Sequence, residues 1–261
     1  MYAFTHHMAS STQDAVSSVG EGKFLAGGHT LLPTMKQRLA MPGHLVDLNK
    51  VPELKGISDD GSKLTIKAMS RHAEVMDSAV VQKAIPGLAA MAGMIGDPQV
   101  RHRGTIGGSV ANNDPVADYP AACLALGATI VTNKRSIPAD DFFQGLFTTA
   151  LEENELITAV EFPHADKFVY EKFRNPASRY ALVGVAVAKR GGDVRVAVTG
   201  AGSDGVFRWT EAEAALKGNF AASALDGLKV AASGLNGDIH GSAEYRAHLI
   251  GVMAKRAVAA A

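Results

Sequence analysis

Two Gly-Gly pairs constrain this chain more than any other feature of the sequence. The first follows an expected strand and precedes an expected helix, and the second follows Arg103-Gly104-Thr105 and precedes Ser109-Val110-Ala111-Asn112. The first lies in Ala26-Gly27-Gly28-His29-Thr30 and the second in Thr105-Ile106-Gly107-Gly108-Ser109. Both pairs leave backbone N–H groups free of side-chain bulk and have Ser or Thr hydroxyls beside them. Such turns form anion nests, in which several amides share one phosphate. Two nests would suit a dinucleotide with two phosphates, but two ordinary tight turns explain the glycines equally well.

A third glycine cluster, Gly200-Ala201-Gly202-Ser203-Asp204-Gly205, matches the G-x-G-x-x-G pattern of nicotinamide dinucleotide sites. That fingerprint requires a βαβ unit and further parallel strands. Here the preceding strand, 194–199, forms a hairpin pattern with 181–189 across Gly191-Gly192-Asp193, and the tail after the cluster is mostly helical. We therefore predict a loop between the last strand and a helix, and no nicotinamide site.

A polar, turn-rich stretch, Asn112-Asn113-Asp114-Pro115-Val116-Ala117-Asp118-Tyr119-Pro120, follows the second glycine pair. Asn and Asp side chains can hydrogen-bond the hydroxyls and ring edge of a nucleotide cofactor. Asn112, Asp114 and Asp118 are therefore candidate binding residues. Asp118 could instead cap a helix that begins at Pro120. Both interpretations can hold for different residues of the stretch.

Composition excludes several classes of protein. The 261 residues include 26 basic and 26 acidic ones without a basic stripe, so we expect no nucleic-acid partner. No apolar stretch approaches the roughly 18 residues of a transmembrane segment, and the first residues lack the pattern of a secretory signal. We expect a cytoplasmic protein, either free or peripheral at the inner membrane face. The nine histidines and the single Cys123 show no ligand spacing, so we expect no metal in this chain.

The order of elements predicts an α+β fold in three parts, 1–54, 55–165 and 166–261. Strands are expected at 23–26, 44–48, 63–68, 128–132, 155–162, 168–173, 181–189 and 194–199. Helices are expected at 11–19, 31–39, 71–78, 85–94 and 120–127, and over most of the chain after 210. A loop is expected between Asp97-Pro98 and Arg103-Gly104.

The two glycine motifs and the acidic stretch together carry a family resemblance. Leu25 to Pro33, Arg103 to Ala111, and Asp114-Pro115-x-x-Asp118 resemble the FAD-binding medium subunit of molybdenum hydroxylases, as in carbon monoxide dehydrogenase and bacterial xanthine dehydrogenase. The resemblance covers almost the whole chain. It implies FAD as the cofactor and a vanillyl-alcohol-oxidase (PCMH) type FAD-binding fold. In that fold two subdomains clasp FAD, and a C-terminal subdomain has a three-stranded antiparallel sheet with helices.

The resemblance also implies individual roles. Ala26 to Thr30 resembles the first diphosphate loop, and Thr105 to Ser109 the second. Asp118 matches an acid that contacts the flavin nucleotide, Ile157 an aliphatic residue on the isoalloxazine, Lys172 a lysine near the pyrimidine end, and Tyr180 a residue near the ring face. The expected cofactor-binding set is Ala26, Gly27, Gly28, His29, Thr30, Leu31, Thr105, Ile106, Gly107, Gly108, Ser109, Asn112, Asp114, Asp118, Ile157, Lys172 and Tyr180. No catalytic residue is expected. Gly107→Val should remove FAD, because a side chain there would block the phosphate.

The implied function is electron transfer within a larger enzyme. The partners would be a molybdopterin-containing large subunit and a small subunit with [2Fe–2S] clusters, in a dimer of heterotrimers. Electrons would leave to quinone, NAD or another acceptor. The alternatives are a stand-alone FAD-dependent dehydrogenase or oxidase of the same fold, with Tyr180 or His29 as its base, and a scaffold that has lost FAD.

Overall fold

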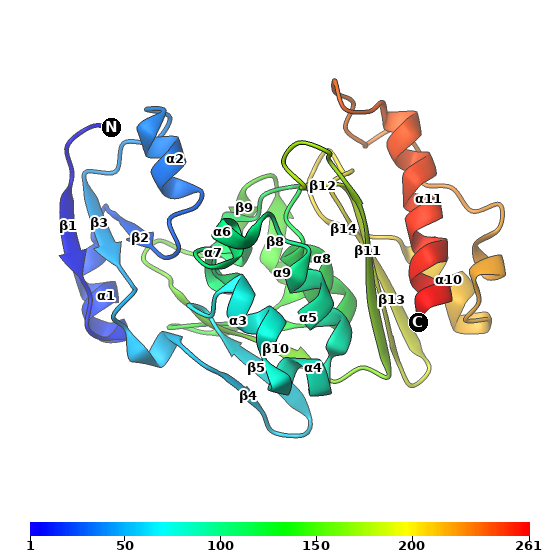
Figure 1. Ribbon diagram of the computed structural model, residues 1–261, viewed down its shortest axis with the longest axis horizontal. Helices are drawn as coiled ribbons and strands as arrows, with labels where there is room; N and C mark the ends of the chain where they lie inside the picture. Colours follow the sequence, from blue (N-terminus) through cyan, green and yellow to red (C-terminus); the bar gives the residue numbers. More distant parts are fainter.

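The computed structural model describes residues 1–261 and has three main sheets that follow one another along the molecule (Figure 1). The two termini lie towards opposite ends of the view. Apolar side chains form separate cores: one in the N-terminal part, one between the middle and C-terminal sheets, and one beneath the last helix. None of the helices combines the length and the apolar composition needed to cross a bilayer.

The N-terminal sheet is small and parallel, in the order β1-β3-β2. Its elements are β1 (Thr5–Met8), α1 (Thr12–Val19), β2 (Lys23–Leu25), α2 (Leu31–Lys36), β3 (His44–Asp47) and the 3-10 turn η1 (Pro52–Leu54). Helix α1 begins where expected, because the Ser11 side chain accepts a hydrogen bond from the Asp14 backbone N–H. The first glycine pair follows directly after the end of strand β2, on the side of the N-terminal part that faces the middle of the molecule (Figure 1).

The middle sheet is antiparallel, in the order β4-β5-β10-β6-β7, and is covered by short helices (Figure 1). Its strands are β4 (Ile57–Asp59), β5 (Lys63–Lys67), β6 (Thr129–Thr132), β7 (Ser136–Pro138) and β10 (Ile157–Pro163), beside a small hairpin of β8 (Phe143–Gly145) and β9 (Thr148–Thr149). Its helices are α3 (His72–Asp77), α4 (Ala79–Ala84), α5 (Pro86–Gly93), α6 (Pro98–Arg101), α7 (Ile106–Asn112), α8 (Tyr119–Leu126) and α9 (Ala139–Phe142). Strand β5 buries alternate residues, as its polar–apolar pattern predicts.

The C-terminal sheet is antiparallel, in the order β11-β12-β13-β14, and carries helices on both faces. Its elements are β11 (Lys167–Arg174), β12 (Ala181–Arg190), β13 (Asp193–Thr199), β14 (Phe207–Arg208), α10 (Thr210–Gly218), the 3-10 turn η2 (Ala222–Leu225) and α11 (Ala243–Ala260). Helices α5 and α8 pack on one face, and α10 and α11 on the other. The first eight residues of β12 are all buried, because helices cover the strand on both sides.

The structure differs from the expected elements in several places, and it also contains unpredicted elements: β1, β4, β7, β8, β9, α7 and α9. The C-terminal sheet has a fourth strand, β14, so the Gly200–Gly205 loop joins two strands rather than a strand and a helix. Helix α6 forms within the expected loop at 97–104, since Asp97 accepts from the Val100 N–H and caps it. Helix α4 is an extra element, and α2 ends at Lys36 rather than Leu39. The Gly191-Gly192 hairpin is as predicted, with Arg190 paired to Asp193.

Candidate functional site

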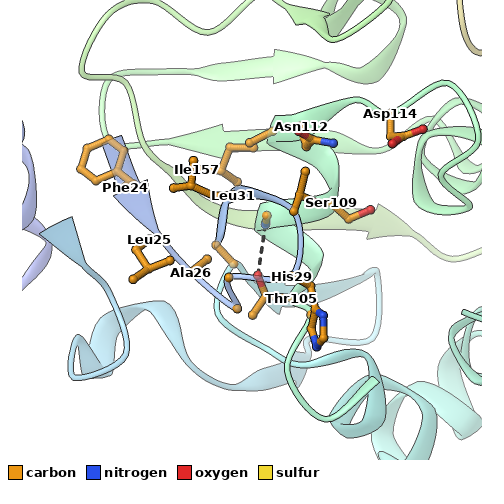
Figure 2. Close-up of a pocket in the computed structure, with 18 of the residues that line it drawn as sticks. Phe24, Leu25, Ala26, His29, Leu31, Thr105, Ser109, Asn112, Asp114 and Ile157 are labelled. Atoms are coloured by element: carbon orange, nitrogen blue, oxygen red, sulfur yellow. Dashed lines mark hydrogen bonds between the residues drawn. The ribbon is translucent and has the colours of Figure 1, made fainter. Parts of the chain in front are cut away.

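A cavity of about 1090 Å³ lies where the three sheets meet. It is large enough for a dinucleotide, since ordinary ligand pockets measure about 300–1,000 Å³. The predicted site residues that line it are Ala26, Gly27, Gly28, His29, Thr30, Leu31, Thr105, Gly107, Gly108, Ser109, Asn112, Asp114, Asp118, Ile157, Lys172 and Tyr180. Figure 2 draws lining residues as sticks, with ten of them labelled, and shows the different segments that carry them. Ile106 is the exception: its side chain is fully buried in the core below.

The two glycine motifs are in direct contact, although 80 residues separate them in the chain. A Cβ on Gly27 would overlap the Arg103 carbonyl oxygen and would lie 3.0 Å from the Gly104 Cα. A Cβ on Gly108 would lie 3.7 Å from the Ala26 Cβ. Only glycine at position 27 lets the first loop approach this closely, so the absence of a side chain there brings the two motifs together.

The first glycine loop presents unpaired amides. The backbone N–H groups of Gly27, Gly28, His29 and Thr30 donate to no acceptor within the chain. Gly28 has φ +76°, a conformation that favours glycine, and the Thr30 hydroxyl has no hydrogen-bond partner. Because these groups line the cavity, the loop fits the anion-nest interpretation rather than that of an ordinary tight turn.

The second glycine pair does not form a separate tight turn. Gly107 and Gly108 belong to the first helical turn of α7. Ile106 and Gly107 donate their N–H groups to the Ser70 and Ala68 carbonyls, and Gly108 donates to the Thr105 Oγ1 at 3.1 Å, the dashed line in Figure 2. Thr105 therefore caps α7. Since the amides are used within the chain, this motif can offer hydroxyls to an anion: the Ser109 hydroxyl has no partner and lines the cavity (Figure 2).

Asp118 does not cap α8, so that interpretation is wrong. It occupies the N-cap position, but its side chain makes no capping hydrogen bond. Its carboxylate instead pairs with the Lys172 ammonium at 2.9 Å and accepts from the Tyr170 hydroxyl at 2.5 Å. Both partners are buried, with 5% and 0% of the Asp118 and Lys172 side chains exposed. Burial raises the pKa of Asp118, and Lys172 and then Tyr170 oppose that rise.

The loop that carries Asp114 and Asp118 is anchored by the C-terminal sheet. The buried Thr199 hydroxyl lies 2.7 Å from the Ala117 carbonyl oxygen and 3.1 Å from that of Pro115. The N–H of Gly200 also donates to the Pro115 carbonyl. The end of β13 thus holds the 114–118 loop in place. Gly200, the first glycine of the third cluster, takes part through its backbone N–H.

Tyr180 and Ile157 reach the cavity from different sheets. Ile157 begins β10 and is almost fully buried beside the cavity (Figure 2). Tyr180 precedes β12, and its ring meets that of His240 edge to face at 6.1 Å. Neither the Tyr180 hydroxyl nor the His29 ring has a hydrogen-bond partner in the chain. No residue orients either group as a general base.

Sequence reasoning missed His72, which lines the cavity from the start of α3. The residue is 5% exposed, and its ring Nδ1 has no hydrogen-bond partner. A Cβ on Gly104 would lie 2.5 Å from its Nε2, so the ring packs under the segment that leads to the second motif. Burial, and then the neighbouring His29 and Arg101, lower the pKa of His72 to about 4. The sequence signal was only a histidine in a predicted amphipathic helix.

Two family models together cover nearly the whole chain. Residues 2–165 match the FAD-binding domain in molybdopterin dehydrogenase, and residues 168–261 match the CO dehydrogenase flavoprotein C-terminal domain. The chain belongs to this family of FAD-binding oxidoreductase subunits. The flavoprotein is 37% identical to the carbon monoxide dehydrogenase medium chain of Hydrogenophaga pseudoflava, over 99% of this chain and 96% of the relative. It is 36% identical to the nicotine 6-hydroxylase medium subunit of Paenarthrobacter nicotinovorans, over 94% and 91%.

Solved structures agree over the full length of the flavoprotein. Carbon monoxide dehydrogenase from Hydrogenophaga pseudoflava, in a form that lacks the Mo-pyranopterin moiety, matches with a TM-score of 0.90 at 39% identity, covering 100% of this chain and 97% of that one. Quinoline 2-oxidoreductase from Pseudomonas putida 86 matches with a TM-score of 0.88 at 30% identity, covering 100% and 97%. The expected family, FAD-binding fold and FAD cofactor are therefore confirmed, and the cavity, the open amides and the glycines suit that cofactor.

Proposed function

We propose that this flavoprotein is the electron-transfer subunit of a multi-subunit molybdenum hydroxylase. It would take electrons from the [2Fe–2S] clusters of a small partner and pass them to quinone, NAD or another acceptor. A molybdopterin-containing large partner would hydroxylate the organic substrate with water and release those electrons. The cluster of unpaired amides at Gly27 to Thr30, held against the second glycine motif, is the observation that carries the proposal.

The FAD diphosphate would lie between the two glycine motifs. The first motif would donate backbone N–H groups, and the second would add the hydroxyls of Thr105 and Ser109. Helix α7 also directs its N-terminus to this region, although its seven residues make the dipole a minor contribution. This division of work follows from the hydrogen bonds of each motif, open in the first and occupied in the second.

The remaining predicted residues would hold the flavin and its ribityl chain. Asn112 has no side-chain partner in the chain and can bond hydroxyls, while Ile157 can pack on an apolar ring face. Lys172, paired with Asp118, would approach the pyrimidine end, and Tyr180 the ring face. Bound FAD supplies a centre that exchanges one or two electrons. The protein contributes position, charge and shielding, and none of these residues needs to act as an acid or a base.

We further propose the wider organisation that the family implies. The chain would be divided into subdomains 1–54, 55–165 and 166–261, which agrees with three separate sheets. Two heterotrimers would associate in the cytoplasm, free or at the inner membrane face. Matches to medium subunits of carbon monoxide dehydrogenase and nicotine 6-hydroxylase support this assignment.

Production of the chain alone and together with its two partners tests the electron-transfer role. We expect the FAD of the isolated chain to stay oxidised in the presence of the complex's organic substrate under anaerobic conditions. It should become reduced once both partners are present. Reduction of FAD by that substrate in the isolated chain would instead support a stand-alone dehydrogenase and refute the proposal.

A further inference from the structure

The hydroxyl of Tyr170 contacts the pair of Asp118 and Lys172, although Tyr170 itself is not among the residues that line the cavity. Tyr170 and Lys172 stand two residues apart on β11, so both side chains point to the same face of the sheet. The hydroxyl donates to Asp118 Oδ1 at 2.5 Å, and Lys172 lies 2.9 Å from that oxygen and 3.0 Å from Oδ2. Asp118 and Lys172 line the cavity, whereas Tyr170 does not. The carboxylate is therefore shared between two buried partners, the Tyr170 hydroxyl and the Lys172 ammonium.

Gly184 makes room for this hydroxyl. It is opposite Lys172 in the ladder of β11 and β12, within a strand of buried apolar residues. A Cβ at Gly184 would overlap the Tyr170 oxygen and lie 2.9 Å from the Thr199 Cγ2. Glycine weakens the middle of a strand, and its presence commonly marks a close approach by another group. Strand β11 thus supplies the Tyr170 hydroxyl, and the glycine in β12 leaves the space that the hydroxyl occupies.

The charges in this cluster are isolated from water. Lys172 has one further neighbour, the Met94 carbonyl oxygen at 3.3 Å. Burial, and then Asp118, raise the pKa of Tyr170 well above its usual value, so the phenol remains a hydrogen-bond donor. A donor on the carboxylate draws negative charge away from the side that faces Lys172. The ammonium, which is fully buried next to the cavity, is then less completely neutralised.

We propose that Tyr170 is a positioning residue, which acts through Asp118 to leave part of the Lys172 charge available to FAD. The inference rests on the proposed function, in which Lys172 lies beside the flavin. Reduced FAD carries more negative charge than oxidised FAD, so the available positive charge favours the reduced form. Tyr170 thereby raises the midpoint potential of the flavin without touching it.

Potentiometric titration of the FAD-loaded chain tests the inference. Tyr170→Phe keeps the ring but removes the donor, and we expect reduced FAD to lose about tenfold in affinity relative to oxidised FAD. This change corresponds to a midpoint potential about 30 mV more negative, for two electrons. Tyr119→Phe is the matched control, because the Tyr119 hydroxyl is buried near Asp118 and has no partner. A purely structural role would leave the potentials of the two variants equal, and that result would overturn the inference.

Two further variants fix the sign and the source of the effect. Asp118→Asn removes the negative charge and should shift the potential in the positive direction, opposite to Tyr170→Phe; a negative shift would contradict the inference. If Tyr170→Phe fails to hold FAD and gives no potential, the potential of Asp118→Asn tests the inference instead. The inference requires Asp118 to neutralise part of the Lys172 charge. Lys172→Gln should lower the potential. An unchanged potential in Lys172→Gln would refute the placement of the flavin, whereas an unchanged potential in Tyr170→Phe alone would refute only the role of Tyr170.

Discussion

Gly107 packs on Ala68 so closely that a Cβ added to Gly107 would lie 2.6 Å from the Ala68 Cβ. Both residues are buried, and the Gly107 N–H also donates to the Ala68 carbonyl. The second glycine motif thus holds helix α7 against the end of β5. Gly107 allows this close packing, and Ser109, two residues later, lines the cavity.

Gly107→Val should therefore remove FAD by displacing α7, not by blocking a phosphate directly. Overpacking a buried position costs about 1–3 kcal/mol, so the free energy of unfolding should fall by that amount as well. Urea unfolding and flavin absorbance of the purified variant measure both effects. Loss of FAD with full stability would restore the simpler explanation, in which the side chain obstructs the phosphate.

Thr199→Val should loosen the loop that carries Asp118. The substitution keeps the shape but removes the hydroxyl that donates to the Ala117 carbonyl at 2.7 Å. Because the Ala117 carbonyl is half-buried, the loss of its donor should cost at most about 1–3 kcal/mol. We expect lower stability in urea and faster dissociation of FAD. Thr148→Val, at an exposed hairpin, is the control, and equal dissociation rates in the two variants would contradict the proposed anchoring.

His72 should make the flavoprotein less stable in mild acid. Its folded pKa of about 4 lies below the ordinary histidine pKa of about 6.5, so the unfolded chain binds a proton more readily. The stabilisation from neutral His72 is complete above about pH 6.5 and is lost as the pH falls towards 4. His72→Gln should flatten that part of the profile when unfolding is measured from pH 7.5 to 4. Parallel profiles for the two proteins would show that His72 does not titrate in this way.

Much of the site was predictable because several of its parts are short continuous segments, each with its own pattern. The glycine motifs and the polar stretch are segments of this kind, whereas Lys172 was expected only from the family resemblance, and the structure brings all of them to one cavity. The hairpin at Gly191-Gly192 was predictable for the same reason, since its turn chemistry is local.

The remaining features depend on contacts between distant segments. No local pattern indicates that Tyr170 reaches Asp118, 52 residues away, or that Thr199 reaches Ala117, 82 residues away. The helical position of Gly107-Gly108 was also hidden, because two glycines are poor helix formers and tertiary packing on Ala68 overrides that preference. The cap interpretation of Asp118 failed for a similar reason, because its partners Tyr170 and Lys172 are on the distant strand β11.

The contact between Gly27 and Arg103 carries the central claim that two glycine motifs together form the FAD site. Gly27→Ala adds a Cβ that must push against the Arg103 backbone, whereas Gly43→Ala meets no atom within 4 Å and requires no unusual φ. The decisive measurement is a titration of each apo variant with FAD. We predict that Gly43→Ala binds as the wild type does, and that Gly27→Ala binds at least about tenfold more weakly, or about 1.4 kcal/mol. Wild-type affinity in Gly27→Ala would contradict the claim.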